Sequence, residues 1–88
     1  DLVVVAVPTR HHGEIAGDSL RAGAHVLIEK PMTATDAEAQ RLMAIAADHG
    51  RRIGVGHSER FNPVVIALKR HWPQIGRVFQ LTIRRLGP

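Results

Sequence analysis

Three short apolar runs alternate with two segments of helical character, and this alternation constrains the fold more than any other feature. The runs cover residues 2–7, 25–29 and 52–57. The first of them, LVVVAV, is continuous and mostly β-branched, which is typical of a strand buried on both faces, as in a parallel sheet. We therefore predict a strand at each of the three runs.

Both segments between the runs carry signals for the start and the end of a helix. The first helix is predicted to begin at His11 or His12 and to end near residue 22, where Gly23 supplies a left-handed C-terminal cap. The second helix is predicted to run to about residue 48 and to open on Thr35 and Glu38, which have the spacing of a capping box.

The first 57 residues therefore follow the order strand, helix, strand, helix, strand. Connections of this length join parallel strands, and such crossovers are right-handed. This order predicts an α/β fold, and more narrowly one half of a doubly wound parallel sheet.

The character of the chain changes near Ser58. Asn62 is a good N-cap and Pro63 suits the first helical position, so we predict a helix from Pro63 to about residue 71. Residues 78–85 then alternate between apolar and polar side chains, which predicts a strand with one solvated face in an antiparallel sheet. We predict two domains, residues 1–58 and residues 59–88, the second beginning an α+β open sheet.

Composition excludes several classes of protein. Apolar residues make up 44% of the 88 residues and charged residues 23%, which is ordinary for a globular protein and argues against disorder. The chain has no cysteine, and no apolar run approaches the roughly 20 residues of a membrane span. The net charge is +4, but the basic residues are scattered and aromatic residues are few, which argues against nucleic-acid binding. We expect a cytoplasmic protein.

Candidate functional residues gather where the predicted strands end. In open α/β sheets ligands bind outside the carboxyl ends of the strands, where residues 8–12, 29–31 and 57–60 lie. Lys30 is the strongest candidate, because a partly desolvated lysine at a strand end can exchange a proton with a hydroxyl group. The alternative is an ordinary surface lysine. Glu29 and Lys30 would point to opposite faces of a regular strand, so no ion pair between them is assumed.

Histidines and one arginine complete the set of candidates. His11 and His12 suit a helix start, a ligand contact or simple solvation. The spacing of the six histidines gives no metal site, and none is predicted. Arg60 lies between a strand end and a helix cap, where it is suited either to a phosphate, carboxylate or carbonyl oxygen or to a surface ion pair with Glu59.

Several of these segments together resemble the Gfo/Idh/MocA family of oxidoreductases. The resemblance rests on the runs 7–16 and 22–31, the second ending in Glu-Lys-Pro, on the short Gly-containing run 53–57, on Arg-Phe-Asn-Pro at 60–63 and on Ile-Gly-Arg-Val at 75–78. It covers essentially the whole chain, with the motifs in family order. It implies that the predicted half-sheet is the carboxyl half of a Rossmann domain, followed by the first helix and strand of the substrate domain.

The resemblance also implies an activity and a site. Members of the family are NAD(P)-dependent oxidoreductases of sugars, cyclitols and related polyols, with NAD or NADP as cofactor. Lys30 matches the catalytic lysine, and its bond to Pro31 is often cis in the family. The cofactor-binding positions implied are Pro8, Thr9, His12, Glu29, Lys30 and Arg60.

Within the family, residues 56–63 are most similar to nucleotide-sugar dehydrogenases, UDP-N-acetylglucosamine 3-dehydrogenases among them. A small-molecule sugar or nucleotide-sugar substrate and a homodimer or homotetramer are therefore expected. The chain departs from the family pattern because it contains no G-x-G-x-x-G turn to hold a pyrophosphate. We expect the parent protein to be an enzyme and the 88-residue piece alone to be inactive. A regulator that senses a dinucleotide or sugar, and an inactive remnant, are the alternatives.

Overall fold

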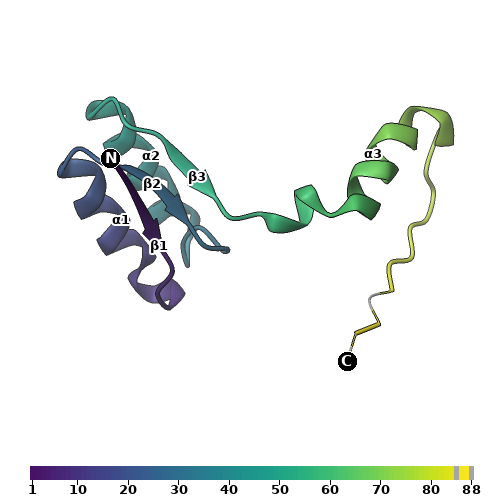
Figure 1. The fold of residues 1–88 in the computed structure, drawn as a ribbon, viewed down its shortest axis with the longest axis horizontal. Helices are drawn as coiled ribbons and strands as arrows, with labels where there is room; N and C mark the ends of the chain where they lie inside the picture. The colour runs from purple at the N-terminus through teal and green to yellow at the C-terminus, as the bar shows by residue number, and fades with distance from the viewer. Residues whose placement is uncertain (85, 88) are drawn as a thin grey trace. The chain divides into compact units, whose positions relative to one another are not determined.

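The computed structural model describes residues 1–84, 86 and 87, and the chain forms two compact units. The first unit comprises residues 1–57 and the second residues 58–88. Figure 1 labels the helices and strands of each unit.

The first unit is a parallel three-stranded sheet with two helices, which confirms the predicted α/β fold. Its strands pair in the order β1–β2–β3, with Val5 opposite Ile28 and Ile28 opposite Val55. The elements are β1 (Leu2–Val5), the 3-10 turn η1 (Thr9–His11), α1 (His12–Arg21), β2 (His25–Ile28), α2 (Asp36–Asp48) and β3 (Ile53–Val55). Each strand is shorter than its apolar run because the chain leaves the sheet before the run is complete.

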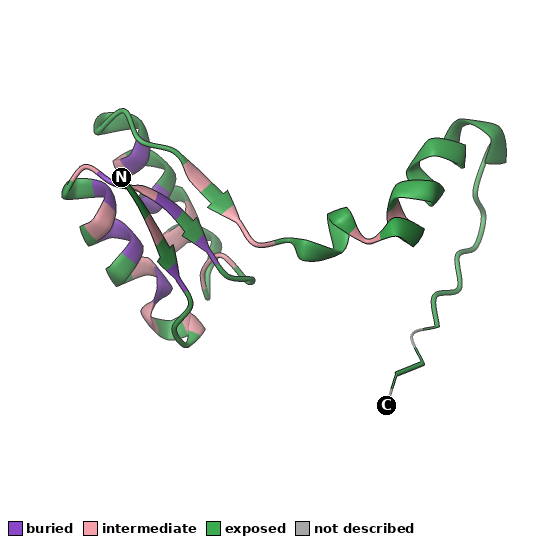
Figure 2. Cartoon of the chain, viewed as in Figure 1, coloured by how far each residue is buried: buried purple, intermediate pink, exposed green. Residues whose placement is uncertain are grey.

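Both helices contribute to one core on one face of the sheet (Figure 2). Leu20 of α1 and Ile28 of β2 are fully buried, and Leu42 of α2 packs in the same cluster. The other members are Val5, Ala16, Val26 and Ala46. This core holds the carboxyl half of β2 in place, directly before the candidate site.

The opposite face of the sheet is apolar and exposed. Leu2 and Val4 of β1 are 63% and 60% exposed, and Leu27 of β2 is 38% exposed. The prediction that the first run is buried on both faces was therefore wrong for one face. Two successive right-handed crossovers running in one direction place both helices on the same side of a sheet, and α1 and α2 do so here.

The predicted helix ends are largely confirmed. Thr35 and Glu38 form the capping box: the Glu38 amide donates to Thr35 Oγ1 at 3.3 Å, and the Thr35 amide donates to Glu38 Oε2 at 3.3 Å. Gly23 follows α1 with φ of +90°, a conformation in which an L side chain is strained. Helix α1 thus ends where the chain takes a positive φ at Gly23.

Two glycine-to-alanine substitutions are expected to change stability in opposite directions. Gly23→Ala should lower the free energy of unfolding by about 1 kcal/mol, because it places a Cβ at positive φ. Gly13→Ala should raise it by about 0.5–1 kcal/mol, because alanine is the better helix former and its Cβ would meet only Glu38 Cδ, at 4.0 Å. Urea unfolding followed by far-UV circular dichroism measures both, and changes of the same sign would contradict this account.

In the second unit, a 3-10 turn η2 (Ser58–Phe61) leads into α3 (Pro63–Ile75). The predicted start of this helix is confirmed: the Val64 amide donates to Asn62 Oδ1 at 3.0 Å. The predicted end was wrong, because α3 continues through Pro73 to Ile75. A proline in the last turns removes one main-chain donor close to where the helix stops in any case.

The strand predicted over residues 78–85 is not observed in the part of it that the structure describes. Residues 78–84 carry no strand, and Arg85 lies outside the described residues. A strand is held by hydrogen bonds to a neighbouring strand. Residues 58–84, 86 and 87 contain no strand, so residues 78–84 have no neighbouring strand in this unit with which to pair.

Candidate functional site

The carboxyl ends of the three strands lie side by side at one edge of the sheet (Figure 1). Main-chain hydrogen bonds continue past the strands: the Glu29 amide donates to the Val5 carbonyl at 3.0 Å, and the Gly56 amide donates to the Ile28 carbonyl at 2.8 Å. The segments that follow the strands therefore start from fixed positions. Two of the three predicted site segments, residues 8–12 and 29–31, are brought to this edge together with His57.

Lys30 lies just beyond β2 and is followed by a cis peptide bond to Pro31. Its side chain is exposed, so the expected partial desolvation is not observed within this chain. The reason is that β2 ends at Ile28, two positions earlier, and Lys30 lies in a bend outside the sheet. Among the described residues its ammonium group has no hydrogen bond or ion pair, so it is available to a ligand.

Glu29 lies over the main chain that follows β3. A Cβ added at Gly56 would lie 3.4 Å from Glu29 Oε1 and 3.5 Å from Oε2, which is ordinary van der Waals contact. The same carboxylate accepts the Lys30 main-chain amide at 3.3 Å. The Glu29 carboxylate therefore lies directly beside the main chain of Gly56, just after β3. This proximity was not predicted from the sequence.

His12 is the first residue of α1 and is only 1% exposed. Its Nε2 lies 2.8 Å from the Val7 carbonyl oxygen, and its Nδ1 lies 2.9 Å from the Pro31 carbonyl oxygen. Both ring nitrogens are therefore engaged by main chain, and neither is left for direct contact with a ligand. Its neighbour His11 is half-buried and accepts a hydrogen bond at Nε2 from Arg10 Nε at 3.0 Å.

The remaining predicted residues lie in two different places. Pro8 is exposed and Thr9 half-buried, and Pro8 anchors the 3-10 turn because its carbonyl accepts the His11 amide at 2.9 Å. Arg60 belongs to the second unit, where its side chain is exposed on the turn Ser58–Phe61. Pro8 and Thr9 thus lie at the same sheet edge as Lys30. Arg60 belongs to the second unit.

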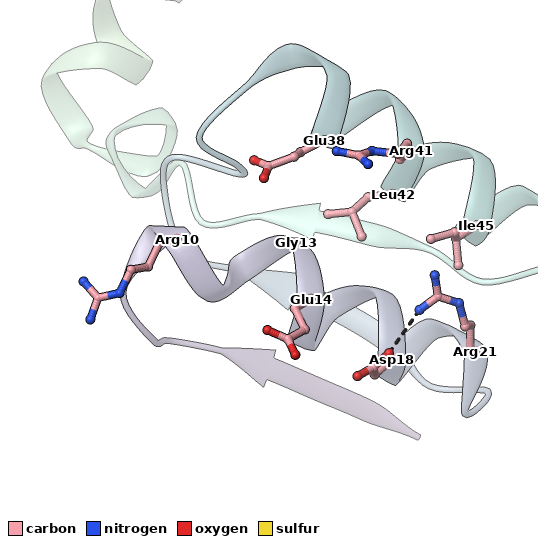
Figure 3. Close-up of a pocket in the computed structure, with 9 residues that line it drawn as sticks. All are labelled: Arg10, Gly13, Glu14, Asp18, Arg21, Glu38, Arg41, Leu42 and Ile45. Carbon is pink, nitrogen blue, oxygen red and sulfur yellow. Dashed lines mark hydrogen bonds and ion pairs between the residues drawn. The ribbon is translucent and has the colours of Figure 1, made fainter.

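A separate groove of about 300 Å³ lies between α1 and α2 (Figure 3). All but one of its lining residues belong to these helices, and its charges balance as three arginines and three carboxylates: Arg10, Arg21, Arg41, Glu14, Asp18 and Glu38. Arg21 and Asp18 pair at 3.0 Å. The groove is thus a product of helix packing, distinct from the loops that follow the strands.

No group of three or more His, Asp or Glu side chains in residues 1–84, 86 and 87 is placed to hold a metal ion. No helix among these residues is both long and apolar enough to cross a bilayer.

The parallel three-stranded sheet, its two crossover helices and the polar loops at its carboxyl edge define a Rossmann-like α/β unit. The model of the oxidoreductase family with an NAD-binding Rossmann fold, Gfo/Idh/MocA, matches residues 1–57. The chain belongs to this family, which confirms the resemblance drawn from its motifs.

Several characterised relatives are similar to this chain. The UDP-N-acetylglucosamine 3-dehydrogenase of Acidithiobacillus ferrooxidans is 33% identical over 88 residues, which is all of this chain and 28% of the relative. Inositol 2-dehydrogenase 1 of Saccharopolyspora erythraea is 41% identical over 71 residues, covering 80% of this chain and 21% of the relative. The chain thus spans less than a third of the length of these relatives.

Solved structures share the fold. The crystal structure of biliverdin reductase from Synechocystis, in complex with biliverdin and NADP+, aligns with a TM-score of 0.84 and 37% identity over 90% of this chain and 25% of the other. The structure of the Acidithiobacillus UDP-N-acetylglucosamine 3-dehydrogenase aligns with a TM-score of 0.76 and 34% identity over 80% of this chain and 22% of the other.

Proposed function

We propose that this chain forms the nicotinamide side of the site of an NAD(P)-dependent dehydrogenase. The proposed reaction is hydride transfer between the cofactor and a hydroxyl-bearing carbon of a sugar, nucleotide sugar or cyclitol. The observation that carries this proposal is Lys30, an exposed ammonium group without a protein partner among the described residues, at the shared carboxyl edge of a parallel sheet. The named dehydrogenases among the relatives support the substrate class.

The residues at this edge fit a nicotinamide cofactor. Glu29 offers carboxylate oxygens above the bare main chain of Gly56, and such oxygens suit the donors of a carboxamide or a ribose hydroxyl. Pro8 and Thr9 lie on the loop after β1, and Lys30 lies on the loop after β2. We assign cofactor contacts to these residues, and the cofactor contact of Arg60 that the family resemblance implies stays a prediction.

The sequence contains no G-x-G-x-x-G turn, so we assign no pyrophosphate contact to this chain. We also propose that residues 1–58 are the carboxyl half of the Rossmann domain. Residues 59–88 would begin the domain that binds substrate and builds a homo-oligomer.

The proton chemistry is the part that this chain's own residues perform. When bound, the cofactor supplies a carbon that accepts or returns hydride. In the oxidation direction, neutral Lys30 Nζ would take the proton of the substrate hydroxyl while the hydroxyl-bearing carbon of the substrate gives up its hydride, and a carbonyl forms. In the reverse direction the Lys30 ammonium donates a proton to the carbonyl oxygen.

The experiment that tests this proposal uses the purified protein that contains this chain. NAD and NADP are each offered with a panel of sugars, nucleotide sugars and cyclitols, including forms deuterated at the hydroxyl-bearing carbon. We expect reduced cofactor that carries the deuterium. Cofactor binding without turnover on every substrate would overturn the dehydrogenase and favour a sensing role, and absence of both would favour an inactive remnant.

A further inference from the structure

Among the described residues, His12 is the one polar or charged side chain that is buried. A buried polar group must find hydrogen-bond partners, and leaving one without a partner is costly. His12 finds its partners in main-chain carbonyls of two segments that are far apart in sequence, at Val7 and Pro31. Its ring therefore connects the loop after β1 to the loop after β2.

The two carbonyls lie next to residues of the candidate site. Val7 directly precedes the segment that begins with Pro8, and Pro31 directly follows Lys30. The distances of 2.8 Å to Val7 and 2.9 Å to Pro31 are both within hydrogen-bond range, and a ring nitrogen that carries a proton donates to the carbonyl that it faces. One side chain, on the first residue of α1, thus contacts the main chain of both loops that lie at the candidate site.

We propose that His12 is a positioning residue for the reaction, which fixes the main chain at Lys30 through Pro31 and the first loop through Val7. This inference rests on the proposed function for its catalytic consequence, and on the two contacts alone for its structural one. His12 touches neither substrate nor cofactor in this account. It acts by limiting where the Lys30 main chain can lie.

The two contacts can be separated by substitution. A neutral imidazole donates from one nitrogen only, whereas an amide NH₂ group always donates. Asparagine at this position places its amide nitrogen close to where His12 Nδ1 lies, facing the Pro31 carbonyl. Glutamine places its amide nitrogen close to where His12 Nε2 lies, facing the Val7 carbonyl. His12→Asn is therefore expected to keep the contact beside Lys30, and His12→Gln to keep the other. His12→Phe fills the space but donates to neither.

The structural test uses nuclear magnetic resonance on the 88-residue chain. In His12→Phe we expect both carbonyl ¹³C resonances, of Val7 and Pro31, to shift. We also expect roughly tenfold faster hydrogen exchange at the His11 amide, which donates to Pro8, with no change at the core amide of Val26. His12→Gln should shift the Pro31 resonance more, and His12→Asn the Val7 resonance more. If His12→Phe does not fold, the two amide variants decide the question.

A matched control exists on α2. His49 Nδ1 also lies 2.9 Å from a carbonyl oxygen, that of Ile45, but it is exposed and the contact stays within its own helix end. His49→Gln is expected to leave the Val7 and Pro31 resonances unchanged. Unchanged carbonyl resonances in all three His12 variants would overturn the proposal.

The catalytic test uses the dehydrogenase that contains this chain. We expect kcat to fall about tenfold in His12→Phe and His12→Gln, to fall less in His12→Asn, and the dissociation constant of the cofactor to change little. Equal kcat in wild type and all variants, with the carbonyl shifts present, would overturn the positioning role. An inactive wild type would overturn the proposed function instead, and the resonances would still decide whether His12 connects the loops.

Discussion

Replacing Lys30 by methionine is expected to lower kcat of the dehydrogenase about 100-fold, because a positioned proton donor and acceptor contributes a factor of that order or more. Methionine keeps the length of the side chain and removes the ammonium group. The dissociation constant of the cofactor should change much less than kcat, since the proton is needed in the transition state. Steady-state turnover and cofactor titration on the same protein measure the two effects.

Two comparisons make this prediction specific. Lys30→Arg keeps a positive charge but cannot take up or release a proton at neutral pH, so it should be nearly as inactive as Lys30→Met. Lys69→Met removes the other lysine of the chain, on α3, and should leave kcat unchanged. If Lys30→Arg had close to wild-type turnover, Lys30 would act through its charge and the proton-transfer role would be lost.

Replacing Leu20 by alanine is expected to lower the free energy of unfolding of the first unit by about 3 kcal/mol. Leu20 is 0% exposed and packs in the core between the two helices and the sheet. A unit of 57 residues has a total stability of only about 3–8 kcal/mol, so this loss would remove between about a third and all of it. Urea unfolding by far-UV circular dichroism measures it, because Trp72 lies in the second unit and its fluorescence would not report on this core.

Leu2 provides the matched control for Leu20. It is the same residue type in the same unit, but it is 63% exposed on the bare face of the sheet. Leu2→Ala should change the free energy of unfolding by less than about 1 kcal/mol. Comparable losses for the two variants would mean that the uncovered face is buried in solution, for example against another molecule of the protein.

The sequence predicted the elements of the first unit because each signal there is local and they agree with one another. The apolar runs, Gly23 as a helix stop and the capping box of Thr35 and Glu38 are each read within a few residues. The exposure of one face of the first run could not be predicted in this way. It depends on which side of the sheet each crossover passes, and residue type alone does not record that.

For the candidate site, topology predicted which loops meet but not how each side chain is used. The carboxyl edge and Lys30 followed from the strand order. The engagement of His12 with two carbonyls, and of Glu29 with the bare main chain of Gly56, depends on loop paths set by contacts distant in sequence. From the sequence alone, a histidine such as His12 could equally contact a ligand. Its partners are main-chain carbonyls, and residue types do not reveal such partners.

The parallel register of β1, β2 and β3 determines which mutations the carboxyl edge of the sheet tolerates. A point substitution in an exposed loop position, such as Pro8, alters one side chain and leaves the backbone where it is. A codon inserted between Val26 and Lys30 would turn alternate side chains to the other face and move Lys30 along the sheet. Recombination between relatives should therefore succeed at β2 only where both parents keep the same number of residues from strand to lysine.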